Sequence, residues 1–328
     1  MNNRRKLIVA LGASALTAPL KSYAQQPNAR MRRIGFLGPT SAAGMAERLE
    51  AFRSGLRELG YVEGKNLNVD FRWAEGDYAR IPQLAAELVA LNVEVLVTHS
   101  TPATLAAMRT TKTVPIVMAV SGDPVPRGII ASLAHPGGNV TGSAFFGPEM
   151  MAKRIELIRE TMPRIKRVAV LLNPKNPGIA TVLKATEATA RSLKLEHHRI
   201  DAQGTDEFNG AFLAMAKKRI EAVVVLEDAI FLANRKMIAD LAIQHRITPI
   251  GFSEFAESGG MIGYGANIPE LFRRAAVFVD KILKGARPAD IPVEQATKFE
   301  LIVNMKTAKA LGIKIPNSIL VRATKVIE

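Results

Sequence analysis

The sequence D-P-V-P-R-G-I-I-A-S-L-A-H-P-G-G-N-V-T-G occupies residues 123–142 and directly follows the apolar segment V-P-I-V-M-A-V at residues 114–120. The apolar segment predicts a buried strand, and the prolines after it prevent a helix from starting at its end. Ser121 and Asp123 are therefore expected just beyond the carboxyl end of a parallel strand. Open α/β sheets bind their ligands at that position.

The remainder of this stretch and both halves of the chain predict alternating strands and helices. A short helical turn is expected from Arg127, and another short strand over residues 139–142, which include Thr141. Elsewhere, apolar segments of strand length alternate with helix-length segments that have one apolar face. This alternation indicates right-handed βαβ units and a mainly parallel sheet in each half. The expected strands cover residues 33–37, 67–73, 93–98 and 114–120 in the first half and 167–172, 196–200, 222–226 and 248–252 in the second.

The tail of the chain departs from this alternation. It contains the glycine-flanked strand G-G-M-I-G-Y-G from residue 259, an amphipathic helix over residues 268–285 and an extended segment over residues 293–303. These pieces are too small for a third domain, so the tail is expected to complete both halves. The prediction is an α/β protein of two lobes, each a doubly wound sheet, with a ligand cleft where the chain crosses between them. The expected lobes are residues 31–142 with 260–290, and residues 143–259 with 291–328.

The first 24 residues predict an export signal. Arg4, Arg5 and Lys6 precede an apolar run over residues 7–20, and S-Y-A at residues 22–24 is a small-x-small cleavage site. The sequence leaves open whether export uses the general or the twin-arginine route. No later stretch is long and apolar enough to predict a membrane span. The chain has no cysteine, which excludes disulfides, thiolate metal sites and a lipid-bearing cysteine. The mature protein is therefore expected to be free and exported.

The formal net charge of +14 overstates the charge of the mature protein. Four basic residues and no acid lie in the predicted signal, which leaves +10. A basic chain can bind nucleic acid, but binders cluster their basic residues. Here no basic run exceeds three residues. The sequence therefore predicts a solvated basic surface and no nucleic-acid partner.

Polar side chains that can bind a ligand gather just beyond the predicted strand ends. Hydroxyls stand where helices begin, and the free backbone N–H groups of a helix start favour a carboxylate. One acid in each lobe, Asp123 and Asp228, can receive an ammonium group. Together these groups suit a free α-amino acid, although ordinary helix caps and turns favour the same residue types. The candidate ligand-binding residues are Thr40, Ser41, Ser100, Thr101, Ser121, Asp123, Thr141, Asn173, Asn176, Asp228 and Tyr264.

The few aromatic residues are expected near the cleft, as ligand contacts or as hinge packing. Tyr264 is among them, with Phe145, Phe146 and Phe252.

Catalytic signals are weak. The five histidines form no metal-ligand spacing, and the sequence contains no G-x-S-x-G nucleophile motif. His99 is expected to line the cleft rather than to act as a base. Residues 35–38 lack the third glycine and the lysine of phosphate-binding loops. The sequence therefore predicts no enzyme, no cofactor and no metal site.

The chain resembles the substrate-binding proteins of ABC transporters of the tryptophan/tyrosine type. The resemblance covers nearly the whole mature chain, beginning with the D-P-V and P-G-G-N-V-T-G elements of residues 123–142. The other matching elements are R-I-G-F-L from residue 33, G-L-R-E-L-G-Y-V-E-G-K-N from 55, N-P-K-N-P from 173, G-G-M-I-G-Y-G from 259, R-R-A-A from 273 and A-D-I-P-V-E-Q-A-T-K-F-E-L-I-V-N-M-K-T-A-K-A-L-G from 289.

The resemblance implies a type I periplasmic binding fold, a periplasmic location and no catalysis. It also implies capture of a small solute and its delivery to an inner-membrane permease with its ATPase. The expected solute is an amino acid, which named members suggest is aromatic, or a related carboxylate, and the expected state is a monomer. Two other functions remain open. An exported sensory module would hand its ligand to a signalling receptor instead. A repressor with the same two-lobed core would need an N-terminal helix-turn-helix, and the predicted signal occupies that position.

Overall fold

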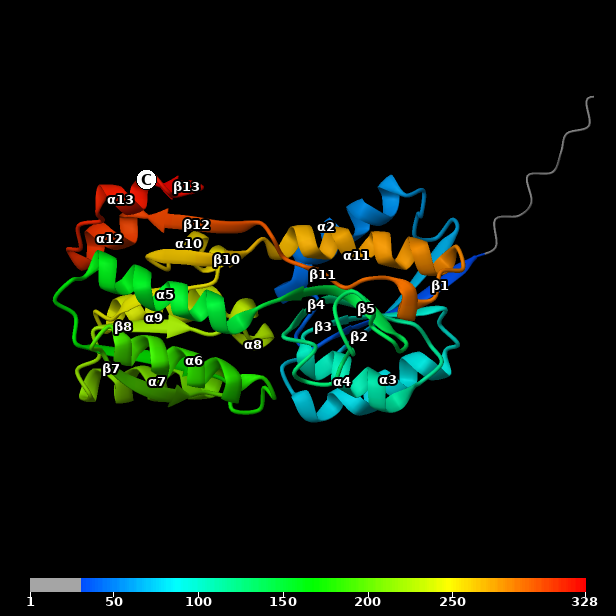
Figure 1. Cartoon of the computed structure of the whole chain (residues 1–328), viewed down its shortest axis with the longest axis horizontal. Coiled ribbons are helices and arrows are strands. Elements are labelled where there is room, and N and C mark those ends of the chain that lie inside the picture. Colours follow the sequence, from blue (N-terminus) through cyan, green and yellow to red (C-terminus); the bar gives the residue numbers. More distant parts are fainter. Residues whose placement is uncertain (1–30) are drawn as a thin grey trace, which may run out of the picture. The chain divides into compact units, whose positions relative to one another are not determined.

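Two mainly parallel sheets organise residues 31–328, which are the residues that the computed structural model describes (Figure 1). The predicted signal lies outside this range. The first sheet has six strands in the order β11-β5-β4-β3-β1-β2, and the second has seven in the order β13-β12-β10-β9-β8-β6-β7. Every strand pair is parallel except β10 with β12. The strands are β1 (Arg32–Gly38), β2 (Leu67–Trp73), β3 (Val95–His99), β4 (Ile116–Gly122), β5 (Val140–Phe145), β6 (Arg167–Leu172), β7 (Glu196–Asp201), β8 (Ala222–Val225), β9 (Thr248–Gly251), β10 (Ile262–Ala266), β11 (Glu294–Gln295), β12 (Phe299–Asn304) and β13 (Lys325–Ile327).

Helices cover both faces of each sheet, and each sheet with its helices is called a lobe. The first lobe carries α2 (Ala46–Glu58), α3 (Ile81–Ala90), α4 (Thr101–Thr110) and α11 (Ile268–Leu283), with the 3-10 helices η1 (Ala43–Met45), η2 (Tyr78–Arg80) and η3 (Pro288–Asp290). The second lobe carries α5 (Gly147–Thr161), α6 (Ile179–Ser192), α7 (Thr205–Lys217), α8 (Ala229–Ala233), α9 (Arg235–Gln244), α10 (Ser253–Glu257), α12 (Met305–Leu311) and α13 (Asn317–Leu320). The predicted alternation of strands and helices, and with it the doubly wound α/β class, is confirmed.

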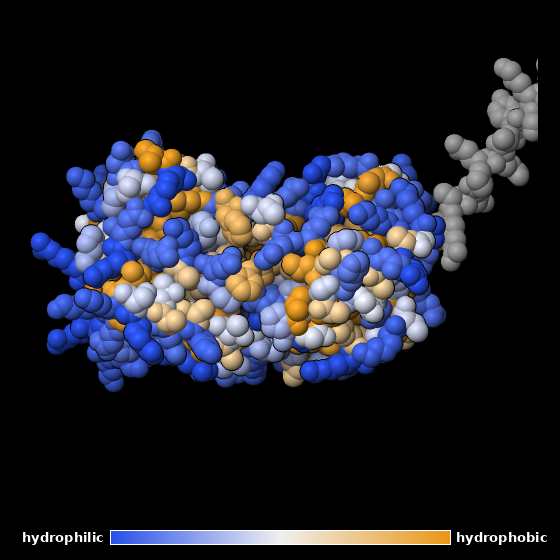
Figure 2. All heavy atoms as spheres, viewed as in Figure 1, coloured by the Kyte–Doolittle hydropathy of each residue, from blue (hydrophilic) through white to orange (hydrophobic). Residues whose placement is uncertain are grey.

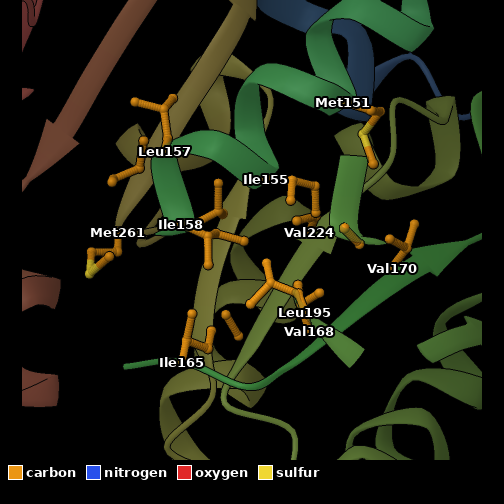
Figure 3. Packing of buried hydrophobic residues seen from close by; sticks show 14 of the residues in the cluster. Met151, Ile155, Leu157, Ile158, Ile165, Val168, Val170, Leu195, Val224 and Met261 are labelled. Carbon is orange, nitrogen blue, oxygen red and sulfur yellow. The ribbon is translucent and has the colours of Figure 1, made fainter. Parts of the chain in front are cut away.

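Each lobe has a hydrophobic core on both faces of its sheet. In the first lobe, α2 and α11 pack on one face and α3 and α4 on the other. In the second lobe, Ile155 and Ile158 of α5 pack against the strand residues Val168 and Val224 (Figure 3). The opposite face of that sheet is covered by α7, α8 and α9. The two sheets are thus separately packed units, as a two-lobed binding fold requires. Hydrophilic side chains cover most of the face displayed in Figure 2, with apolar side chains in scattered groups.

The chain crosses between the two sheets three times, after β5, after β10 and after β11 (Figure 1). These positions differ from the predicted segment boundaries. All of β5 belongs to the first sheet, whereas β10 pairs with β9 and β12 in the second. The short strand β11 pairs with β5 and therefore returns to the first sheet. We propose that the lobe boundaries lie at these three crossings.

The stretch that follows β4 differs from the predicted helical turn. Residues 124–128 form hydrogen-bonded turns, in which Gly128 N donates to Val125 O and Ile129 N donates to Pro124 O. Two prolines in this short segment remove the backbone donors that a helix needs. Among residues 31–328, no helix is long and apolar enough to cross a membrane.

Candidate ligand-binding site

A cavity lies between the carboxyl ends of strands from both sheets, where α/β folds bind ligands. It has an empty volume of about 650 Å³, part of which is open to solvent. From the first lobe it is lined by His99, Ser100, Thr101, Val120, Ser121, Gly122, Asp123, Arg127, Phe145 and Ile268. From the second lobe it is lined by Gly147, Asn176, Gly178, Val182, Leu226, Glu227, Asp228, Ala229 and Leu232.

Asp123 presents an unsatisfied carboxylate oxygen to this cavity. Its backbone has a positive φ of 44°, an unusual conformation for a residue that is not glycine. Gly147 N donates to Oδ1 at 3.3 Å, and Oδ2 has no hydrogen-bond partner within the described part of the chain. Burial raises the pKa of Asp123, although the guanidinium of Arg127, 3.5 Å from Oδ2, opposes the rise. The site therefore contains a strained acid whose Oδ2 is ion-paired with Arg127 but accepts no hydrogen bond, and it can accept one from a second cation.

Hydroxyl groups gather at the amino end of α4. Ser100 precedes the helix with φ 83° and ψ 156°, and its side chain does not cap the helix. Its buried Oγ has no partner among residues 31–328. The hydroxyl oxygen of Thr101 accepts from Gly122 N at 3.2 Å and lies 3.0 Å from Ser121 Oγ. If Thr101 donates to Ser121, the proton of Ser121 is free for a ligand. Together with the positive end of the α4 dipole, these hydroxyls form a place for an anion.

Asp228, in contrast, is already saturated. It accepts hydrogen bonds from Ile230 N at 3.0 Å, Asn176 Nδ2 at 3.1 Å and Asn173 Nδ2 at 3.4 Å. The hydroxyl of Tyr78, in the first lobe, donates to both oxygens at 3.0 and 3.1 Å. Burial and Asp228 raise the pKa of Tyr78 well above its ordinary value, so the phenol keeps the proton that it donates. Asp228 therefore joins the two lobes and has no free oxygen to offer to an ammonium group.

Arg127 also joins the lobes. Its Nη1 donates to Gly122 O and to Asp123 O, and its Nη2 donates across the cavity to Gly178 O at 3.0 Å. The contact depends on a residue without a side chain, since a Cβ on Gly178 would lie 1.9 Å from Nη2. The guanidinium therefore fills one end of the cavity and fixes the loop that carries Asp123.

The remaining wall is mostly apolar. Val182, Leu226 and Leu232 line it from the second lobe, and Phe145 and Ile268 line it from the first. Burial, together with the positive charge of Arg48, lowers the pKa of His99 to about 3. Its imidazole is therefore neutral at physiological pH. A bulky uncharged side chain suits such a wall.

The cavity contains six of the predicted binding residues: Ser100, Thr101, Ser121, Asp123, Asn176 and Asp228. The expectation that His99 lines the cleft is also met.

The other five candidates do not line this cavity. Thr40 is buried outside it, and Ser41 Oγ accepts from Gly44 N at the start of η1. Thr141 lies near the amino end of β5, the end away from the cavity, and donates to Ile291 O at 2.8 Å. Asn173 lies behind Asp228, which it supports. The ring of Tyr264 stacks on Phe299, because β10 pairs with β12 instead of returning to the first sheet.

Sequence reasoning missed the groups that connect the lobes. Arg127 stands in the quoted stretch, but its hydrogen bond to Gly178 depends on how the second lobe lies against the first. Within the second lobe, the cavity residue Glu227 forms an ion pair with the buried Arg154 of α5, which has no local sequence signal either. Tyr78 lies 150 residues from Asp228 in the chain. Contacts between residues so far apart in the sequence form only when both sheets are assembled.

We expect the buried charge of Asp123 to reduce the stability of the unliganded protein at neutral pH. Because burial raises its pKa in the folded state, stability is lost progressively as the pH rises from the unfolded pKa through the folded pKa. Asp123→Asn should therefore be more stable than the parent at pH 7. The difference should disappear below the unfolded pKa of about 3.9, where both side chains are neutral. Urea unfolding from pH 3 to 8 measures it, and a difference that grows towards acid pH would contradict the assignment.

The fold and the cavity define a class: a type I periplasmic binding protein with a solute site between two α/β lobes. Residues 33–327 match the family described as ABC transporter substrate binding protein. The chain therefore belongs to that family, whose members bind solutes and are not enzymes.

Several characterised proteins are similar to this chain. A tyrosine-binding protein of Clostridioides difficile (strain R20291) is 27% identical over 286 residues, which are 87% of this chain and 82% of the relative. The structure of an ABC domain from Streptococcus pneumonia in complex with L-Trp has 27% identity and a TM-score of 0.83, covering 90% of this chain and 99% of that one. A conserved domain protein from Vibrio cholerae has 28% identity and a TM-score of 0.84, covering 90% and 100%.

Proposed function

We propose that the protein captures a free α-amino acid with a bulky apolar side chain and delivers it to an ABC importer. One observation carries the proposal: a carboxylate oxygen of Asp123 that accepts no hydrogen bond, although it is ion-paired with Arg127, shares a cavity with the Ser100 hydroxyl at the start of α4, which also has no hydrogen-bond partner within residues 31–328. An acid and an anion site in one cavity are complementary to the two charges of an amino acid zwitterion.

The proposed ligand is oriented by its two charged groups. Its ammonium donates to Asp123 Oδ2, and its carboxylate accepts from Ser100, Ser121 and the first backbone N–H groups of α4. The side chain then lies against the apolar wall that includes Val182, Leu226 and Phe145. The names of two similar proteins, a tyrosine-binding protein and a complex with L-Trp, support an aromatic or similarly bulky side chain.

The proposed setting is the periplasm. The N-terminal signal is removed on export, and the mature monomer closes its lobes on the ligand. The closed form then docks on an inner-membrane permease that works with an ATPase. Closure is a shift of population towards the conformation that the ligand binds better. The three chain crossings near the cavity are the proposed hinge.

A thermal-shift panel tests the ligand class. A ligand that binds only the folded state at a hundred times its Kd stabilises that state by about 2.7 kcal/mol. Tyrosine, tryptophan, phenylalanine and leucine are the first probes. Tyramine and 3-(4-hydroxyphenyl)propanoate, which lack the carboxylate and the ammonium of tyrosine, are matched controls. We expect shifts with amino acids and none with the controls. The proposal is wrong if no amino acid raises the melting temperature of protein freed of bound ligand.

A further inference from the structure

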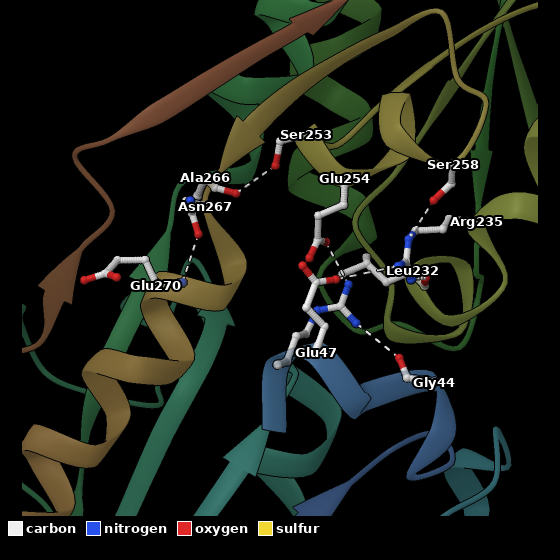
Figure 4. Close-up of polar contacts among 11 residues, drawn as sticks. Gly44, Glu47, Leu232, Arg235, Ser253, Glu254, Ser258, Ala266, Asn267 and Glu270 are labelled. Atoms are coloured by element: carbon white, nitrogen blue, oxygen red, sulfur yellow. Dashed lines mark hydrogen bonds and ion pairs between the residues drawn. The ribbon is translucent and has the colours of Figure 1, made fainter. Parts of the chain in front are cut away.

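A buried ion pair connects the two lobes outside the cavity. Arg48 lies on α2 of the first lobe, and Glu254 lies on α10 of the second. Arg48 Nη2 is 2.7 Å from Glu254 Oε2, and the two side chains are only 3% and 7% exposed. Figure 4 shows this contact region. Glu254 and Arg235 of the second lobe face Gly44 and Glu47, which belong to η1 and α2 of the first lobe.

Neither residue of this pair lines the cavity. Arg48 is nevertheless close enough for its charge to lower the pKa of His99, which does line it. The charge of Arg48 therefore acts on a residue of the cavity wall, although the pair itself lies outside the cavity. It forms only when the lobes come together, since its partners belong to separately packed sheets.

The pair is incompletely satisfied. Arg48 Nη1 donates to Gly44 O at 3.3 Å, but Arg48 Nε and Glu254 Oε1 have no hydrogen-bond partner within residues 31–328. In an open conformation, water would hydrate both charges. The desolvation of two charges offsets most of their attraction, so such a pair contributes little net stability. Removal of one partner is different, because it leaves a single charge buried and uncompensated.

We propose that Arg48 and Glu254 form a ligand-independent latch that controls closure of the lobes. The latch disfavours closure when one of the two charges is buried without the other, and the intact pair adds little stability to the closed state, so release remains possible. It sets the affinity for every ligand by the same factor, because it acts on the conformational equilibrium and not on the ligand. This last statement depends on the proposed function, whereas the effect on closure does not.

The test compares Arg48→Met, Glu254→Met and the double variant. Each single variant should weaken the binding of tyrosine and of leucine by the same factor, at least tenfold and on the order of a hundredfold. The double variant replaces two charges with apolar side chains of similar size, which is often neutral or stabilising. Its affinity should therefore recover to the parent value or exceed it. Glu47→Gln is the matched control, because Glu47 forms an exposed ion pair with Arg235 between the same lobes at 3.9 Å. Its affinity should change less than about twofold.

A distance measurement on unliganded protein separates the latch from the ligand proposal. The chain has no cysteine, so Lys65→Cys and Lys184→Cys place one spin label on each lobe at exposed positions. The single variants should shift the distance distribution towards the open form, and the double variant should shift it back. Unchanged distributions in all three variants, or a double variant as open and as weak as the single ones, would overturn the latch. Failure of every amino acid to bind the parent would remove the proposed function and leave the distance result intact.

Discussion

Replacing Asp123 with asparagine is expected to weaken amino acid binding by roughly 10- to 150-fold, the equivalent of a charge-assisted hydrogen bond of about 1.5–3 kcal/mol. The substitution keeps the shape of the side chain and its acceptor for Gly147 N. It replaces Oδ2, which accepts no hydrogen bond in the unliganded protein, with an amide NH₂, which donates and cannot receive the ammonium. Calorimetric titration of the best amino acid ligand measures the loss.

The control for this substitution is Glu149→Gln. Glu149 is exposed and borders a neighbouring groove that also includes Asp123, but it does not line the ligand cavity. The two variants remove the same charge from the same region. The comparison therefore separates direct contact with the ligand from long-range electrostatics. Equal losses in both variants would indicate that Asp123 acts only through the general field of the site.

Replacing Gly142 with alanine is expected to destabilise the folded protein by more than about 3 kcal/mol. Gly142 has φ 129°, and a Cβ there would lie 2.2 Å from Met118 O and 2.7 Å from Met118 N. These are backbone atoms of the adjacent strand β4, which cannot move without breaking the pairing of β4 with β5. Urea unfolding measures the effect.

Gly138→Ala provides the comparison for Gly142. A Cβ at Gly138 would have no heavy atom within 4 Å, and its φ is not in the left-handed region. Such a substitution leaves stability unchanged or raises it by about 0.4–1 kcal/mol. If both alanine variants unfold at the same urea concentration, the close approach of Gly142 to the Met118 backbone does not explain why a glycine stands at position 142.

Local patterns predicted the strand ends that surround the cavity. The apolar run before Ser121 and Asp123 specifies a buried strand, and the prolines after it specify where that strand stops. Ser100 was found in the same way, from the end of a strand and the start of a helix. These signals are short in sequence, because strand length and helix start depend on neighbouring residues.

The predicted contacts that the structure places differently have a common physical cause. Tyr264 was placed at the cleft because residues 260–290 were assigned to the first lobe. A glycine-flanked strand, however, carries no signal for the sheet that it joins. Asp228 was correctly placed at the cavity, but its saturation by Tyr78 depends on contact between the two lobes. The Arg48–Glu254 pair is likewise a product of assembly, and neither residue stands in a recognisable motif.

The central claim is that one cavity binds both charges of an amino acid. A crystal structure with the amino acid that gives the largest thermal shift tests this most directly. We expect the ammonium nitrogen within hydrogen-bond distance of Asp123 Oδ2 and the carboxylate against Ser100 and the start of α4. A ligand bound with its carboxylate towards Asp123, or bound outside this cavity, would contradict the claim.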